Sequence, residues 1–284
     1  MPKKPAMTVQ FWGVRGSIPS PGTTTVRYGG NTSCVSVEMG KKYRLVLDAG
    51  TGIRLLGKTL QARPETIFVL LSHSHWDHIQ GFPFFSPLYE PKRKVYVFPT
   101  LTGKAHWCSA LKQMDGAHFP VTPDRLPSRT HCITEGGMDF LADHGLCIVP
   151  IPTNHPGGGS GYRLEHAGRS VVYLTDNELA PPYEPATDFD TFADFCRHAD
   201  VLIHDAQYLE SDMPQKHGWG HSLVSQACAL AAAAQVKHLI LFHHDPERTD
   251  DEIDAIQDMA RAWLQTQDQP VQCTAAYEGL VMQL

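Results

Sequence analysis

Four side chains of the types that bind divalent metals, His73, His75, Asp77 and His78, lie within six consecutive residues. They follow the apolar run Thr66–Leu71, which is typical of a buried strand, so all four leave one strand end. His73 and His75 are two apart in an extended stretch and therefore project to the same side. Asp77 and His78 follow one turn later and can face a second centre. Imidazole and carboxylate ligands suit zinc, manganese or iron, and this density exceeds what one tetrahedral ion needs. The segment therefore predicts a site for two metals.

Three further candidate ligands, His155, Asp176 and His243, occur later in the chain. Each comes just after an apolar run that predicts a strand, which is also where the first four candidates lie. An aspartate such as Asp176 can stand between two cations, which need an anion between them to tolerate each other's charge. These positions predict one site that is assembled from several strand ends.

The apolar runs also predict the elements that position these residues. Strands alternate with turns in the first half of the chain, and helices alternate with strands in the last third. This order predicts one α/β domain over residues 1–284, with two sheets packed face to face under helices. We expect strands at 8–12, 34–38, 43–48, 66–71, 94–98, 147–151, 160–164, 170–174, 201–205, 238–242 and 278–284, and helices at 191–198, 222–235 and 250–265. Ser222 is the expected N-cap of the second helix.

Residues 101–135 differ from the rest of the chain because they show no regular hydrophobic period. They contain several prolines and aromatic residues, which is typical of an irregular segment. We expect an insertion or lid that overhangs the site.

The composition argues against a membrane protein, a secreted disulfide-bonded protein and a basic nucleic-acid-binding protein. Of 284 residues, 42% are hydrophobic, yet no apolar run approaches the ~20 residues of a membrane span. No apolar signal-peptide core is found near the start, so we expect a cytoplasmic protein without a membrane partner. Seven scattered cysteines without a CxxC pair indicate reduced thiols. The net charge of -6 provides no basic surface, so long structured nucleic acid is not an expected partner.

The ordered series of candidate ligands resembles that of the metallo-β-lactamase superfamily, and the resemblance covers nearly the whole chain. Other segments are similar to the ribonuclease Z-like phosphodiesterase branch: Phe11–Pro19 with Arg27 beyond it, Asp48–Gly52, Gly161-Tyr162, His204-Asp205-Ala206, Gly220-His221-Ser222 and Phe242–Pro246. The resemblance implies a four-layer αββα sandwich with the metals at one edge between the sheets. It also implies two divalent ions, zinc in preference to manganese or iron, and suggests a homodimer.

The resemblance gives each candidate ligand a role. One metal would take His73, His75 and His155, and the other would take Asp77, His78 and His243, with Asp176 as the bridge. Strand register and the family pattern favour His243 over its neighbour His244. Asp176 also counts against antibiotic hydrolysis, because true β-lactamases of the superfamily lack an aspartate at its position.

Two departures from ribonuclease Z bear on the substrate. The chain has no long arm containing glycine and proline for tRNA binding, and it carries Asp205 where that branch has a glutamate. We therefore expect phosphodiester hydrolysis on a small or flexible substrate, such as a cyclic nucleotide or a short oligonucleotide.

The expected mechanism uses a metal-bridging hydroxide as the nucleophile, because a bound metal brings the pKa of water to about 7. Asp77 would act at this centre directly. The leaving alkoxide still needs a proton, which His221 can supply from the start of a helix while Asp205 orients its imidazole. Both residues could instead be structural, in a helix cap or a loop. Asp48 is expected to brace the metal loop by hydrogen bonding.

Five further residues are weaker candidates for substrate binding, and each has an alternative structural role. Arg15 and Arg27 could meet a phosphate, or they could tie down the loop between them, which is rich in glycine and proline. His118, His217 and Trp219 could line the entrance, or they could be ordinary surface residues.

A thioester or lactone hydrolase is the alternative function. Glyoxalase-II-like and lactonase members of the superfamily use nearly the same ligand set, so the ligands alone do not separate the two. The Asp205 and His221 pair favours the phosphodiesterase, because a thiolate leaves without a proton donor. Di-iron redox relatives usually carry a fused flavin domain, for which the chain has no room.

Overall fold

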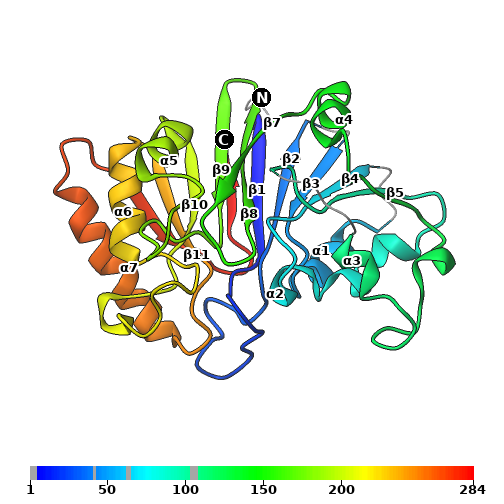
Figure 1. The fold of residues 1–284 in the computed structure, drawn as a ribbon, viewed down its shortest axis with the longest axis horizontal. Coiled ribbons are helices and arrows are strands. Elements are labelled where there is room, and N and C mark those ends of the chain that lie inside the picture. Colours follow the sequence, from blue (N-terminus) through cyan, green and yellow to red (C-terminus); the bar gives the residue numbers. More distant parts are fainter. Residues whose placement is uncertain (1–4, 41–42, 62–64, 103–107) are drawn as a thin grey trace.

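The computed structural model describes residues 5–40, 43–61, 65–102 and 108–284. Two sheets pack face to face, and helices cover both outer faces (Figure 1). This is the four-layer αββα sandwich, so the expected fold class is confirmed. Within the described ranges, no helix has the length and apolar character that crossing a membrane requires. All seven cysteines are free thiols, as expected.

The first sheet comes mainly from the first half of the chain. Its strands are β1 (Met7–Gly13), β2 (Cys34–Met39), β3 (Tyr43–Leu47), β4 (Thr66–Leu70), β5 (Lys94–Phe98), β6 (Arg129–Cys132) and β13 (Val281–Gln283). They are ordered β13-β1-β2-β3-β4-β5-β6. β13, β1, β2 and β3 pair antiparallel, whereas β3 to β6 run parallel.

The second sheet comes from the second half of the chain. Its strands are β7 (Cys147–Thr153), β8 (Gly159–His166), β9 (Arg169–Leu174), β10 (Val201–Asp205), β11 (His238–Phe242) and β12 (Gln272–Ala275), in the order β12-β11-β10-β9-β8-β7. β9 to β12 are parallel, so the carboxyl ends of β9, β10 and β11 meet at one edge. In parallel sheets this edge is where ligands bind.

Helices cover the outer face of each sheet. The α-helices are α1 (Ile53–Thr59), α2 (Trp76–Ile79), α3 (Ser109–Lys112), α4 (Gly137–Asp143), α5 (Phe189–Cys196), α6 (Val224–Ala233) and α7 (Asp250–Gln265), of which α4 packs against the core between the sheets instead. α5, α6 and α7 pack on the second sheet, and α1, α2 and α3 lie against the first (Figure 1).

Strand β4 illustrates why the apolar runs are continuous. Phe68 and Leu70 face the core between the sheets, whereas Ile67 and Val69 face the core beneath α1. Side chains alternate between the two faces of a strand, and here both faces are buried. Each run must therefore stay apolar until it reaches the sheet edge, where the polar candidates begin.

Most expected elements are found within a few residues of their predicted bounds, but the cap of α6 is a correction. Leu223, not Ser222, is the N-cap residue. The Ser222 hydroxyl instead donates to the Asn177 carbonyl oxygen at 2.6 Å and accepts from the Leu179 amide. Ser222 is therefore hydrogen-bonded to residues distant in sequence and is not available to cap α6.

The segment 101–135 is more regular than expected. Residues 103–107 lie outside the described residues, and the part that follows forms α3, a loop and strand β6. β6 pairs only with β5 among the described strands and completes that end of the first sheet.

Candidate metal centre

The seven predicted ligands lie together at one edge of the sandwich. They come from the segment after β4, the loop after β7, and the ends of β9 and β11. Their ligand atoms form two groups, in each of which all atoms lie within 4.8 Å of one another: His73, His75, His155 and Asp176, and Asp77, His78, Asp176 and His243. The structure thus brings together the residues that the sequence predicts as ligands.

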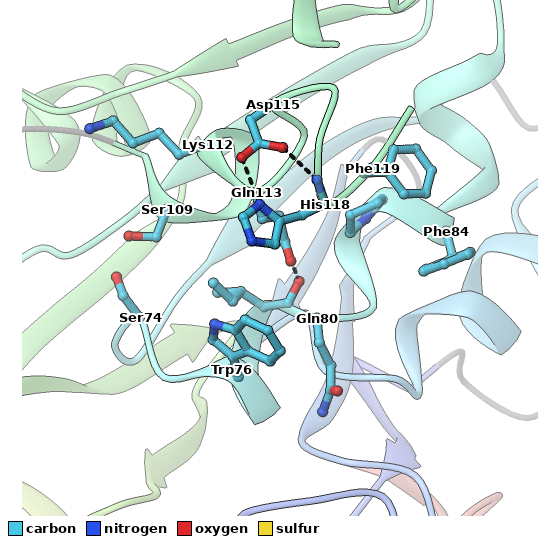
Figure 2. A pocket seen from close by; sticks show the side chains of 12 residues that line it. Ser74, Trp76, Gln80, Phe84, Ser109, Lys112, Gln113, Asp115, His118 and Phe119 are labelled. Carbon is cyan, nitrogen blue, oxygen red and sulfur yellow. Dashed lines mark hydrogen bonds and ion pairs between the residues drawn. The ribbon is translucent and has the colours of Figure 1, made fainter. Parts of the chain in front are cut away.

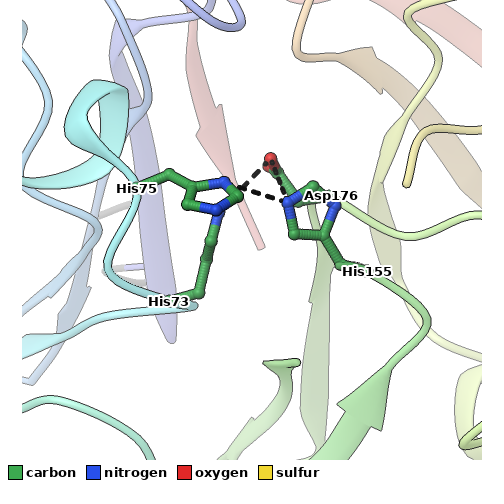
Figure 3. Close-up of side chains that lie close together, drawn as sticks. All are labelled: His73, His75, His155 and Asp176. Atoms are coloured by element: carbon green, nitrogen blue, oxygen red, sulfur yellow. Dashed lines mark hydrogen bonds and ion pairs between the residues drawn. The ribbon is translucent and has the colours of Figure 1, made fainter. Parts of the chain in front are cut away.

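Asp176 belongs to both groups and turns one carboxylate oxygen toward each. Its Oδ1 lies 3.6 Å from Nε2 of His73 and 3.9 Å from Nε2 of His155 (Figure 3). Its Oδ2 lies 3.1 Å from Nε2 of His78 and 3.2 Å from Nε2 of His243. This division of the two oxygens suits a carboxylate that lies between two cations.

The donor set fits divalent cations. Within the described part of the chain, the buried Nε2 atom of His73 has no hydrogen-bond partner. Such atoms cost free energy unless something pairs with them. Burial lowers the pKa of His73 and of His155, which favours the neutral imidazole that has a lone pair to offer. Neutral imidazoles and carboxylates are ligands of zinc and similar ions.

Hydrogen bonds at the other ring nitrogen hold the imidazoles in place. His78 Nδ1 lies 2.8 Å from Asp48 Oδ2, and His243 Nδ1 lies 2.9 Å from Gln207 Oε1. Such partners fix the ring orientation and are typical of metal-binding histidines. Gln207 was missed in the sequence, because nothing near it marks a partner of His243.

Asp48 is the centre of the bracing network. Besides His78, it accepts hydrogen bonds from the Ser72 amide at 2.6 Å, the Ser72 hydroxyl at 2.8 Å and the Tyr173 hydroxyl at 2.7 Å. The structure therefore places Asp48 in the bracing position that the sequence suggests. Tyr173 was not predicted, and it joins this network from the opposite sheet.

Several residues of the site have a left-handed backbone. The φ angles are 60° at Asp48, 49° at Asp176 and 62° at His243, each at the end of a strand. Ser17, whose amide donates to Asp77 Oδ2 at 2.8 Å, has a φ of 63°. This conformation is uncommon for residues other than glycine, and four of the eight such residues in the described chain belong to this site, which points to a functional constraint.

His221 and Asp205 form a buried pair beside the second group. His221 Nδ1 lies 2.6 Å from Asp205 Oδ2, and the His221 ring stacks on His243 at 5.0 Å between centroids. Burial alone would lower the pKa of His221, but the charge and hydrogen bond of Asp205 outweigh it and raise that pKa to about 9. An imidazole held protonated at this position can donate a proton.

His244 does not join the cluster. Its Nε2 lies 2.8 Å from the carbonyl oxygen of Ala276, and its ring packs edge-on against Tyr28. The geometry therefore agrees with the choice of His243 over His244.

Arg15 and Arg27 have structural roles here. Arg15 is fully buried and donates to the carbonyl oxygens of Gly29 and Asp245. Arg27 pairs with Asp254 on α7. Both arginines therefore anchor loops, which is the second of the two roles that the sequence allows for them.

A cleft of about 420 Å³ opens onto the cluster. It is lined by Ser17, Ser74, His75, Trp76, Asp77, Asp176, His221 and His243. The proton-donor candidate and both groups of ligands therefore face one space.

We expect Gly220→Ala to weaken metal binding about 10- to 100-fold, the range seen when the partner of a ligating histidine is lost. The Gly220 carbonyl accepts from His155 Nδ1 at 3.0 Å, and an added Cβ would lie 2.0 Å from that nitrogen. Metal titration of the purified variant measures the effect.

Gly279→Ala is the matched control. Gly279 has a φ of 91°, against 89° for Gly220, and an added Cβ there meets nothing within 4 Å. This control has the same free-energy cost of ~1–2 kcal/mol for placing alanine at a positive φ, but its Cβ makes no contact with a histidine. Equal metal affinity in the two variants would contradict the proposed role of the Gly220 contact.

The sequence matches the model of one protein family, the beta-lactamase superfamily domain, over residues 43–244. A ribonuclease Z of Thermoplasma volcanium is 38% identical over 98 residues, which are 34% of this chain but only 29% of that protein's length. A ribonuclease Z of Bradyrhizobium sp. is 23% identical over 86% of this chain and 91% of its own.

Among solved structures, the metallo-β-lactamase fold protein YhfI from Bacillus subtilis is similar over nearly its whole length. The TM-score is 0.67 at 19% identity, and the match covers 98% of this chain and 99% of the other. At this identity the likeness concerns the fold.

Proposed function

Because the chain belongs to the beta-lactamase superfamily, in its ribonuclease Z-like branch, we propose that it is a metal-dependent phosphodiesterase. The observation that carries the proposal is the position of Asp176, whose two oxygens face two separate groups of histidines. The proposed cofactor is a pair of divalent cations, zinc in preference to manganese or iron.

The ligands follow from the two groups. One cation would be held by His73, His75 and His155, and the other by Asp77, His78 and His243, with Asp176 shared between them. When bound, such a pair of cations supplies an activated water near neutral pH and neutralises the charge of a phosphate.

His221 would protonate the leaving group. Asp205 occupies the Nδ1 side of its imidazole, which leaves the Nε2 proton for donation toward the cleft. An alkoxide is a poor leaving group, and a positioned donor typically contributes on the order of 10²–10⁴-fold to the rate. A thioester would gain little from this pair, because a thiolate leaves without a proton, so the pair favours a phosphodiester over a thioester.

The proposed substrate is a small or flexible phosphodiester, such as a cyclic nucleotide or a short oligonucleotide. The cleft of about 420 Å³ suits a ligand of this size, and the net charge of -6 disfavours a long polyanion. The homodimer, the single domain and the lid expected from the sequence remain predictions.

A substrate panel tests the proposal. Protein reconstituted with zinc or manganese is offered bis(p-nitrophenyl) phosphate, a thioester and a lactone. We expect cleavage of the phosphodiester, its loss on chelation, and its return when metal is added back. Turnover of only the thioester or lactone would overturn the proposal in favour of the carboxylic-ester-type hydrolase.

A further inference from the structure

A second cleft adjoins the one at the candidate metal centre. Its volume is about 530 Å³, and Ser74 and Trp76 line both clefts. The opposite wall comes from α3 and the loop after it, including Lys112, His118 and Phe119 (Figure 2). A molecule bound at the cluster could therefore extend past Ser74 and Trp76 into this space.

The walls of this second cleft carry exposed aromatic rings. Trp76 is 72% exposed and Phe84 is 57% exposed, and both line the cleft. Phe119 meets Phe84 edge to face, with ring centroids 5.3 Å apart. Single exposed aromatic residues are common, but several that line one cleft are typical of a binding surface.

The polar groups of the cleft are held in place. Asp115 accepts from the backbone amide of His118 and pairs with its Nδ1, both at 2.7 Å, so the imidazole stays at the rim. Gln113 donates to the carbonyl oxygen of Ile79 at 2.7 Å, which ties α3 to the end of α2. The far wall is therefore anchored to the same segment that carries the metal ligands.

We infer that this second cleft binds the nucleobase of a nucleotide substrate, with the base stacked on Trp76 and its phosphate at the metal cluster. The inference rests on the proposed phosphodiesterase function. Trp76 lies between His75 and Asp77 in the chain, so a base on its ring belongs to the nucleoside that bears the reacting phosphate. Stacking accepts any base, because every base has a planar face.

Equilibrium binding tests this assignment without turnover. Adenosine 5′-monophosphate and ribose 5-phosphate are titrated into metal-loaded protein by calorimetry. We expect wild type to prefer the nucleotide, and Trp76→Ala to weaken nucleotide binding roughly 5- to 100-fold with ribose 5-phosphate unaffected. Trp76→Phe should restore most of the loss, because it keeps an aromatic face.

Two further variants guard against indirect effects on the ligands beside Trp76. Phe119 is far from these ligands in sequence, and Phe119→Ala should also weaken binding of the nucleotide but not of ribose 5-phosphate. Trp263→Ala, an exposed tryptophan on α7, is the matched control and should change neither affinity. Equal affinity of wild type for both probes, or equal weakening of both by Trp76→Ala, would overturn the inference.

The outcomes for the subsite and for the function are separable. If bis(p-nitrophenyl) phosphate is cleaved but the two probes bind alike, the phosphodiesterase stands and the nucleobase subsite falls. If no phosphodiester is cleaved but the nucleotide binds through Trp76, the subsite stands and the proposed reaction falls.

Discussion

Asp176→Asn is expected to remove about one equivalent of bound metal and to lower kcat/KM on the order of 10³-fold. The carboxylate presents one oxygen to His73 and the other to His78, at 3.6 Å and 3.1 Å. An amide keeps the shape but loses the charge that allows two cations to lie close together. Loss of several kcal/mol of charge stabilisation corresponds to a rate effect of this size. Metal analysis and steady-state kinetics measure the two effects.

Asp200→Asn is the matched control for the loss of a buried carboxylate. Asp200 is buried and pairs with Arg169 and Lys237, just before the start of β10 rather than at the ligand-bearing ends of the strands. This variant can lose stability but should keep its metal. Full metal content and an unchanged rate in Asp176→Asn would show that Asp176 is not a shared ligand.

His221→Ala should divide substrates by their leaving group. On a diester with an unactivated alkoxide we expect a loss of about 10²–10⁴-fold in kcat, because the proton donor is gone. On bis(p-nitrophenyl) phosphate the rate should stay nearly the same, since p-nitrophenolate leaves without a proton. Asp205→Asn should follow the same pattern, because Asp205 holds the imidazole through the contact of 2.6 Å.

His217→Ala is the control from the same segment, because His217 is exposed. It should change the rate on neither substrate.

His221 could itself be a ligand, since its ligand atom groups with those of Asp176, Asp205 and His243 within 4.8 Å. Loss of metal together with equal slowing of both substrates in His221→Ala would support that role and contradict the proton donor.

The sequence predicts the candidate centre well because its signals are local. An apolar run that is buried on both faces stays apolar to its last residue, so the abrupt appearance of His73, Asp176 or His243 marks the sheet edge. Both halves of the chain show this pattern. The common edge then follows from the sandwich fold.

The partners of these ligands could not be predicted in the same way. Gln207 contacts His243 from the segment after β10, and Tyr173 contacts Asp48 from β9; no local pattern distinguishes them from ordinary residues. Ser222 illustrates the opposite error: its local sequence predicts a helix cap, but its hydroxyl instead donates to the carbonyl oxygen of Asn177.

Strand β6 was missed for a different reason. Arg129–Cys132 contains no apolar run, and its side chains are exposed or only half-buried. A strand at the end of a sheet needs few apolar residues, and backbone hydrogen bonds to β5 define it. Hydrophobic periodicity therefore cannot reveal it.

The division of the ligands between the two sheets bears on how the protein matures. His73 to His78 follow β4 of the first sheet, whereas His155, Asp176 and His243 follow β7, β9 and β11 of the second (Figure 1). Neither half of the newly made chain contains a complete coordination sphere. If the proposed cations bind these residues, their full coordination requires both halves to have docked, and the bound ions would oppose separation of the halves.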